Sequence, residues 1–167
     1  MLTASPRVLV TALVVLVAAC SDKTAAPAAA DASTPTGPPE SYESVRGNFV
    51  LTLPAAFRGN YRVKESADTI LGARFAAEIV YPADSAGKIP SRTILVVRVF
   101  TKASWEKLSG TKGFAGALKR AERGDDVFTL SMITSNPYKF ESAPARMVDR
   151  MMLAATTGGL HIDITPR

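Results

Sequence analysis

The composition of the chain changes near residue 42, and this change limits which part can build a folded core. Residues 21–42 are rich in alanine and proline, with scattered serine and threonine and almost no branched apolar side chain. Such a stretch cannot bury enough apolar surface to offset the entropy that is lost on ordering. We expect an extended tether there. Residues 43–167 follow as one domain, which is long enough for a hydrophobic core without disulfides or metal.

Residues 1–19 have the three parts of a secretory signal peptide. Arg7 supplies the positive charge, residues 8–17 form a nearly apolar run, and two alanines precede Cys20. The run is about half of the ~20 residues that a membrane-spanning helix needs, so we expect no permanent span. Cys20 is the one cysteine of the chain, so it has no partner for an intramolecular disulfide.

The run Leu16-Val17-Ala18-Ala19-Cys20 resembles the lipobox of bacterial lipoproteins. In that family the cysteine becomes the first residue of the mature protein, its thiol takes a diacylglyceryl group, and its amine can take a further chain such as palmitate. Two or three chains hold a protein stably on a bilayer, because each buried methylene contributes roughly 0.8 kcal/mol. The resemblance implies lipidation at Cys20 and a domain in the cell envelope that faces the periplasm. Ser21 then favours the outer membrane over the inner one in a Gram-negative cell, and an ordinary cleaved signal is the alternative.

Hydrophobic periodicity in residues 43–167 predicts alternating strands and two helices. Ser142 can cap the second helix, whose methionine-rich stripe we expect in the core. We therefore expect an α+β domain, with a mostly antiparallel β-sheet of five to six strands and two or three helices packed on it. The expected strands are 49–53, 61–65, 70–81, 93–100, 127–134 and 160–164, and the expected helices are 101–108, 142–156 and, less well specified, 114–123.

The strand Phe49-Val50-Leu51-Thr52-Leu53-Pro54, followed by Tyr61 and a helix with Trp105, is similar to uncharacterised extracytoplasmic bacterial domains. More remotely, it resembles the α/β sandwich shared by Mog1 and the photosystem II extrinsic protein PsbP. Those domains usually have a tryptophan soon after the proline, whereas this chain has Phe57 there. The resemblance implies a fold and carries over no function, metal site or partner site.

His161 is the one histidine of the chain, which removes most catalytic and metal schemes. The strand period places it beside Asp163 on an outward face, where an exposed pair is favoured over a general base. A metal site would need a second histidine or a free cysteine. We therefore expect no metal and no cofactor, and we nominate no catalytic residue.

The formal net charge of +5 favours an anionic neighbour, such as lipid headgroups or an acidic glycan, with simple solubility as the alternative. We expect no nucleic-acid partner, because no basic and aromatic RNA-binding motif is present. Arg62 and Lys64 on the second strand, and Tyr138 in a turn, are candidates for a partner surface. Core packing is the alternative for the Tyr138 ring.

These features together predict a membrane-anchored lipoprotein with a non-catalytic binding or accessory role, whose partner is an envelope protein or an anionic polymer. One alternative is an envelope glycan hydrolase that uses carboxylates such as Glu65, Glu78 or Asp163. Another is an inhibitor of a periplasmic or secreted hydrolase. A cleft with two carboxylates about 5–10 Å apart would favour the enzyme.

Overall fold

The computed structural model describes residues 38–67, 71–84, 86–111 and 117–163. The chain divides into two units, 1–32 and 33–167, and all described residues belong to the second. The expected signal peptide, Cys20 and most of the expected tether therefore lie outside the described residues. Among the residues that are described, no helix is long and apolar enough to cross a membrane.

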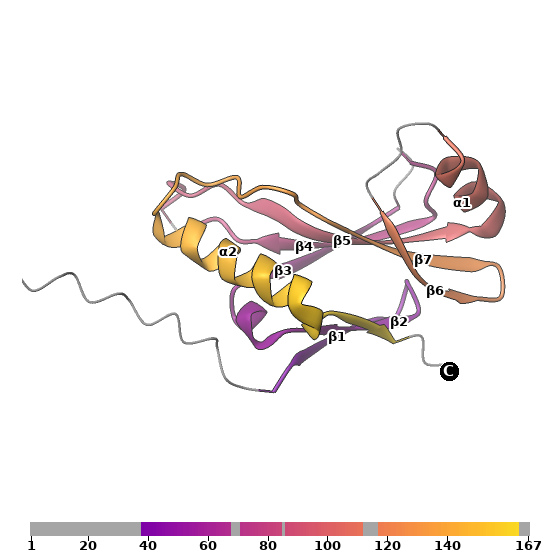
Figure 1. Ribbon diagram of the computed structural model, residues 1–167, viewed down its shortest axis with the longest axis horizontal. Helices are drawn as coiled ribbons and strands as arrows, with labels where there is room; N and C mark the ends of the chain where they lie inside the picture. The colour runs from indigo at the N-terminus through magenta and orange to yellow at the C-terminus, as the bar shows by residue number, and fades with distance from the viewer. Residues whose placement is uncertain (1–37, 68–70, 85, 112–116, 164–167) are drawn as a thin grey trace, which may run out of the picture. The chain divides into compact units, whose positions relative to one another are not determined.

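The described strands form two antiparallel sheets, which confirms the expected α+β class (Figure 1). The smaller sheet has the order β1-β2-β8, and the larger has the order β3-β4-β5-β7-β6. The elements are β1 (Glu40–Ser44), β2 (Phe49–Leu53), β3 (Arg62–Ser66), β4 (Phe75–Tyr81), β5 (Arg92–Thr101), α1 (Lys102–Ser109), β6 (Leu118–Arg123), β7 (Asp126–Met132), α2 (Ala143–Ala154) and β8 (His161–Asp163).

The smaller sheet is organised around β2, along which buried and half-buried residues alternate. Phe49, Leu51 and Leu53 all point inward and are buried. A short turn joins β1 to β2 and passes close to the core at Gly47. A Cβ atom there would lie 2.5 Å from the Phe49 ring and 2.6 Å from the Phe75 ring, so this position has room only for glycine.

The inner faces of the two sheets pack against each other and form the main core, to which α2 adds a third side (Figure 1). The Phe49 ring meets the rings of Phe75 and Phe128 edge-on, with centroids 6.3 and 6.2 Å apart. This geometry is favourable for aromatic rings. Met151 of α2 is fully buried in the same cluster. The smaller sheet and α2 therefore cover the same face of the larger sheet.

A second, smaller cluster lies under α1. Phe100 and Val127 are fully buried there, and the Trp105 ring lies 5.7 Å from the Phe100 ring. Thr101 caps the helix, because its side-chain oxygen accepts a hydrogen bond from the backbone amide of Ser104 at 3.1 Å.

The two expected helices are confirmed, and so is the cap, since the Ser142 hydroxyl accepts a hydrogen bond from the Ala145 amide at 3.3 Å. The third helix, expected over 114–123, is wrong at its described end. Leu118–Arg123 forms β6 and pairs with β7, because cross-strand pairing overrides the helix propensity of this segment. The sheet also begins at Glu40, inside the stretch that composition assigned to the tether.

Candidate functional site

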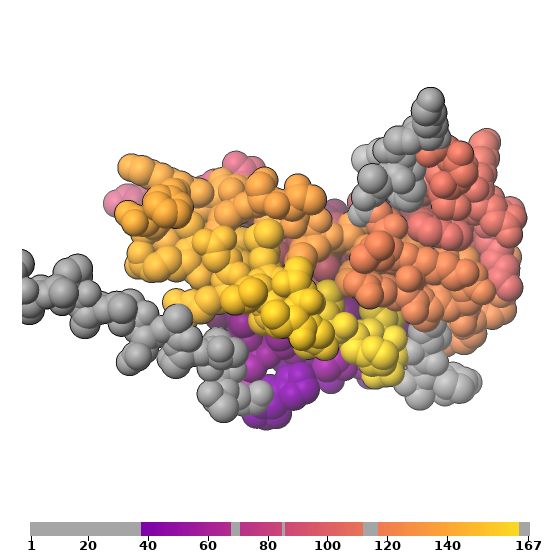
Figure 2. Space-filling view, in the orientation of Figure 1, coloured from indigo at the N-terminus to yellow at the C-terminus, as the bar shows by residue number. Residues whose placement is uncertain are grey.

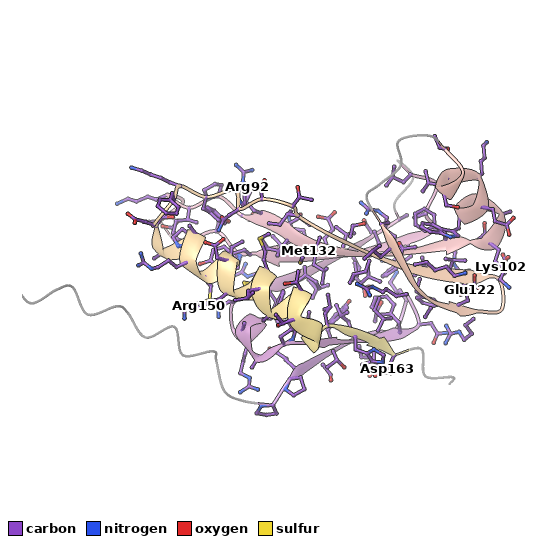
Figure 3. The ribbon with its side chains drawn as sticks, viewed as in Figure 1. Arg92, Lys102, Glu122, Met132, Arg150 and Asp163 are labelled. Carbon is purple, nitrogen blue, oxygen red and sulfur yellow. The ribbon has the colours of Figure 1, made fainter. Side chains whose placement is uncertain are left out.

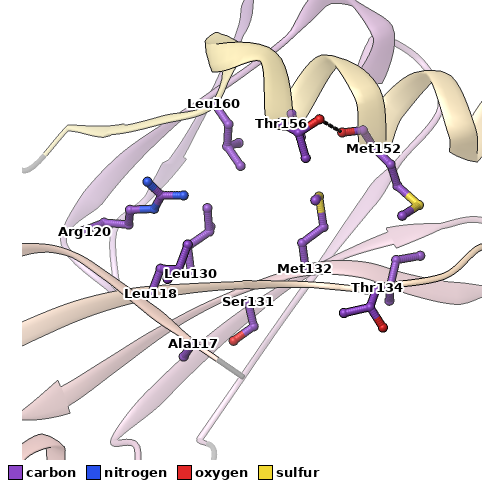
Figure 4. Close-up of a pocket in the computed structure, with 12 residues that line it drawn as sticks. Ala117, Leu118, Arg120, Leu130, Ser131, Met132, Thr134, Met152, Thr156 and Leu160 are labelled. Carbon is purple, nitrogen blue, oxygen red and sulfur yellow. Dashed lines mark hydrogen bonds between the residues drawn. The ribbon is translucent and has the colours of Figure 1, made fainter. Parts of the chain in front are cut away.

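An apolar groove runs between α2 and the strands β6 and β7, with a cavity volume of about 650 Å³ (Figure 4). This volume is within the range of about 300–1,000 Å³ that is typical of ligand sites. Figure 2 shows the surface over it, between the yellow atoms of α2 and the orange atoms of β6. The apolar part of the lining comes from Leu118, Leu130, Met132, Met152, Ala155 and Leu160.

The groove exists because the larger sheet extends beyond the area that the smaller sheet and α2 cover. The alternation along β7 turns Phe128, Leu130 and Met132 toward the core. Phe128 and Leu130 are buried, whereas Met132 is half-buried and lies between the sheet and α2 (Figure 3). On β6, Leu118 lies opposite Leu130 and is 61 % exposed. The groove is therefore a continuation of the core that neither the smaller sheet nor α2 covers.

The C-terminal end of α2 forms the opposite wall. A π-helical turn over Ala155–Gly159 follows α2, and Gly158 adopts a φ of 103°, which glycine tolerates far better than other residues. This turn ends the helix and leads into β8, and it places Leu160 over the groove, opposite Leu118 in Figure 4. The Thr156 hydroxyl donates to the Met152 carbonyl oxygen at 3.1 Å, so this hydroxyl is already satisfied within the helix.

Arg120 is the only charged residue among the described residues that line the groove. The register between β6 and β7 shifts between Lys119 and Ala121, so Arg120 is an extra residue in a bulge. Its side chain points to the same side as Leu118 (Figure 4). Within the described part of the chain, its guanidinium has no hydrogen-bond or ion-pair partner.

The other charged groups of β6 are already engaged. Lys119 forms an ion pair with Glu122, and its hydrogen bond lowers the pKa of that carboxyl. Arg123 donates to the backbone oxygen of Asn48 at 3.0 Å and lies 5.6 Å from the centroid of the Phe128 ring. Arg120 is therefore the group of β6 that can offer its charge to a ligand in the groove.

A polar cluster closes the opposite margin of the core, where β1 meets β3. Glu65 accepts hydrogen bonds from the hydroxyls of Tyr42 and Ser44, the second at 2.7 Å. Ser44 is only 1 % exposed, and its oxygen also accepts from the Gly47 amide at 2.9 Å. Burial, and then the hydrogen bond to Glu65, raises the pKa of the Tyr42 hydroxyl. A raised pKa keeps this hydroxyl protonated, which suits a structural donor and not a base or nucleophile.

The carboxylates considered for glycan hydrolysis lie on separate surfaces. Glu65 points inward, whereas Glu78 lies on the outward face of the larger sheet and accepts from the Thr93 hydroxyl at 2.7 Å. Asp163 lies on β8 with its oxygen 2.9 Å from the His161 ring nitrogen, which confirms the expected exposed pair. Among the described residues, no group of three histidine, cysteine or acidic side chains could hold a metal ion.

The residues expected at a partner surface do not all share one face. Arg62 and Lys64 are exposed on β3, on the outward side of the larger sheet. Tyr138 packs against the Tyr81 ring at 5.5 Å and donates to the Pro90 carbonyl oxygen at 2.7 Å. Tyr81 packs on the main core, so Tyr138 lies on the inner side of the larger sheet, opposite to the side of Arg62 and Lys64. Arg62 and Lys64 thus form a pair without Tyr138.

No protein-family model, curated protein or solved structure matches this chain. The resemblances to lipoproteins and to the Mog1 and PsbP fold therefore stay predictions. Sequence reasoning also missed the groove, because its walls come from elements far apart in the chain. It expected the methionine stripe of α2 in the core, and the structure divides that stripe between buried Met151 and groove-lining Met152.

Proposed function

We propose that this protein is a lipid-anchored component of a bacterial cell envelope, whose domain binds another envelope component in the groove and has no catalytic role. The anchor rests on the lipobox-like run that ends at Cys20. The observation that carries the binding role is an apolar groove that contains one unpaired guanidinium, from Arg120, among its described lining residues. An apolar cavity with a few polar groups that fix orientation is the usual form of a binding site.

The catalytic alternative has less support. Glycoside hydrolysis needs two carboxyl groups that flank one bond. Glu65, Glu78 and Asp163 lie apart, and each has a hydrogen-bond partner within the domain. A second binding candidate is the outward face of β3, where Arg62 and Lys64 are both exposed and would suit an anionic polymer.

Site-specific photo-crosslinking in intact cells tests the proposal. A photoreactive phenylalanine derivative replaces Leu118 at the groove, and a second variant carries it at Lys64 on the outward face. We expect one defined adduct from position 118, which disappears with Arg120→Glu and with the anchor variant Cys20→Ala. Adducts that form only from position 64 would move the binding site to the outward face. If the adduct from position 118 still forms in the Arg120→Glu variant, the result would contradict a groove-specific ligand.

A further inference from the structure

We infer that the groove binds the anion of a single-chain fatty acid. In this arrangement the carboxylate binds the Arg120 guanidinium, and the hydrocarbon chain lies along the apolar walls between α2 and the strands β6 and β7. The inference rests on the proposed function and names the chemical class of its ligand.

The described lining of the groove offers a ligand very few polar groups. Apart from Arg120, its polar side chains are the hydroxyls of Ser131, Thr134 and Thr156. The Thr156 hydroxyl donates to the backbone of α2 at 3.1 Å, so it is already satisfied. The hydroxyls of Ser131 and Thr134 point away from the groove in Figure 4. Among the described side chains, the guanidinium of Arg120 is therefore the polar group that a ligand in the groove can use.

Such a lining disfavours ligands that carry many polar groups. A peptide or a sugar in the groove would bury amides or hydroxyls, and each of them would lose its hydrogen bonds to water without gaining a new partner. A molecule with one charged head and one hydrocarbon chain has a single polar group to satisfy. The apolar walls and one guanidinium match that composition.

Charge complementarity selects the sign of the head. Arg120 is the only charged residue among the described lining residues, and no described group pairs with its guanidinium. A guanidinium can bind a carboxylate through two parallel hydrogen bonds, which fixes the position of the head. A cationic head would place two like charges side by side, so the groove favours an anion.

The arrangement of the walls suits one chain that extends from this head. Figure 4 shows Arg120 at one end of the groove, beside Leu118 and Leu160. Met132 and Met152 lie farther along the groove from Arg120. Methionine side chains are flexible and polarisable, so they can adapt to a hydrocarbon chain that itself adopts many conformations. Each methylene that packs against these walls should then strengthen binding.

Two other occupants can be separated from a fatty acid by their behaviour. A peptide from a partner protein would bind through its own side chains and backbone, and a second copy of this chain would form a dimer. The affinity of neither depends on the length of a hydrocarbon chain. A dependence on chain length therefore identifies the fatty acid.

Isothermal titration with a series of fatty acids tests the hydrocarbon part of the ligand. The protein is the purified full chain with Cys20→Ala, which lacks the expected acyl anchor and is therefore studied without detergent. Octanoate, decanoate and dodecanoate are each titrated below the concentration at which they form micelles. Because every buried methylene contributes a similar increment, the affinity should rise about tenfold from each acid to the next.

A matched pair of substitutions tests where the chain lies. Thr156 and Thr157 are both exposed, but only Thr156 is among the described residues that line the groove. Thr156→Phe fills part of the groove and should weaken dodecanoate binding about tenfold or more, whereas Thr157→Phe should bind within about twofold of the parent protein. Circular dichroism checks that both variants are folded.

A second pair tests the head and does not depend on the first. Arg120→Gln removes the charge and should weaken dodecanoate binding about tenfold, while the gain from decanoate to dodecanoate stays the same. Lys64→Gln removes a charge on the outward face of the larger sheet and should bind within about twofold of the parent protein. Dodecyltrimethylammonium has a cationic head, and the parent protein should bind it about tenfold or more weakly than dodecanoate.

Each contrary result overturns the inference in a recognisable way. Absence of binding, or an affinity that does not rise with chain length, would exclude a hydrocarbon chain from the groove. Equal binding of the cationic amphiphile, or unchanged binding in Arg120→Gln, would exclude an anionic head at Arg120. Equal effects of Thr156→Phe and Thr157→Phe would place the chain elsewhere. These results leave the proposed envelope-binding function intact, which fails separately if crosslinks from position 118 are absent in cells.

Discussion

The core between the two sheets ends differently at its two margins. Where β1 meets β3, the margin is closed by Glu65, which accepts hydrogen bonds from Tyr42 and Ser44. Where β6 meets α2, no described residue closes the margin, and Leu118 is 61 % exposed beside the groove. A domain of this size can therefore close one margin with three polar side chains. The other margin keeps an apolar surface that contributes little to stability, which is typical of a surface for binding.

The largest effect is expected in the core between these margins. Phe128→Ala removes a fully buried ring that lies 6.2 Å from the Phe49 ring, so it should lower the free energy of unfolding by about 3–5 kcal/mol. Urea denaturation of the purified protein measures this change. A loss below about 1 kcal/mol would mean that the two sheets do not share one core.

Breaking the closed margin should have the next largest effect. Glu65→Leu leaves the hydroxyls of Tyr42 and Ser44 without their acceptor, and we expect a loss of about 1–3 kcal/mol in urea denaturation. Glu65→Gln is the control, because it keeps one carbonyl oxygen that can accept, and should cost less. If Glu65→Leu is as stable as the wild type, the polar cluster does not close this margin.

The cap of the helix that borders the open margin should matter less. Ser142→Ala removes the acceptor for the Ala145 amide and should cost about 1 kcal/mol, measured as a lower urea midpoint at constant slope. Ser142→Asp keeps an acceptor and should retain most of this stability. An unchanged midpoint in Ser142→Ala would show that packing alone fixes the start of α2.

The closed margin should also make stability depend on pH in alkaline solution. Folding raises the pKa of Tyr42, so the protonated hydroxyl contributes to the free energy of unfolding. That stabilisation is fully present below the unfolded pKa of about 10 and is lost as the pH rises toward the folded pKa. We expect the free energy of unfolding to fall by less than it does when the Ser142 cap is removed. Tyr42 is only partly buried, so water screens its interactions. Denaturation at several pH values above 9 measures it. Tyr42→Phe should flatten the decline, and an equally steep decline in that variant would assign it to other groups.

The smallest effect on stability is expected at the open margin. Leu118→Ser removes an exposed apolar side chain and should change the free energy of unfolding by less than about 0.5 kcal/mol. The same change should reduce ligand capture by the groove in a binding titration. A stability loss comparable to that of Phe128→Ala would show that Leu118 belongs to the core.

The sequence predicted every described strand except β1 and β6, and the edge strands β3 and β8 were among those predicted. β2, β5 and β7 bury strongly apolar faces, so their patterns alone were sufficient. β1 and β6 lie at sheet edges and bury little, so polar segments such as Leu118–Arg123 carry no clear period of two. The sequence also did not predict the division into two sheets, because a strand pattern does not specify which strands pair.

The groove could not be predicted for a related reason. Leu118, Met132, Met152 and Leu160 belong to separate segments, and each has the composition of an ordinary core residue. Among the described elements, the positions of α2 and of the smaller sheet decide which of these apolar residues stay uncovered. The pairing of His161 with Asp163, by contrast, follows from the strand period alone, and the structure confirms it.

The position of β2 between β1 and β8 has a consequence for how the chain folds. The β1–β2 hairpin is local and can form early, but Val50 of β2 also pairs with Asp163 near the C-terminus. Contacts between distant parts of the sequence slow folding, because a long loop must close before they form. A chain that is synthesised from its N-terminus onward therefore keeps one edge of β2 unpaired until β8 has been made. During that interval this edge can pair with other chains, so the cell must keep newly made molecules apart until β8 arrives.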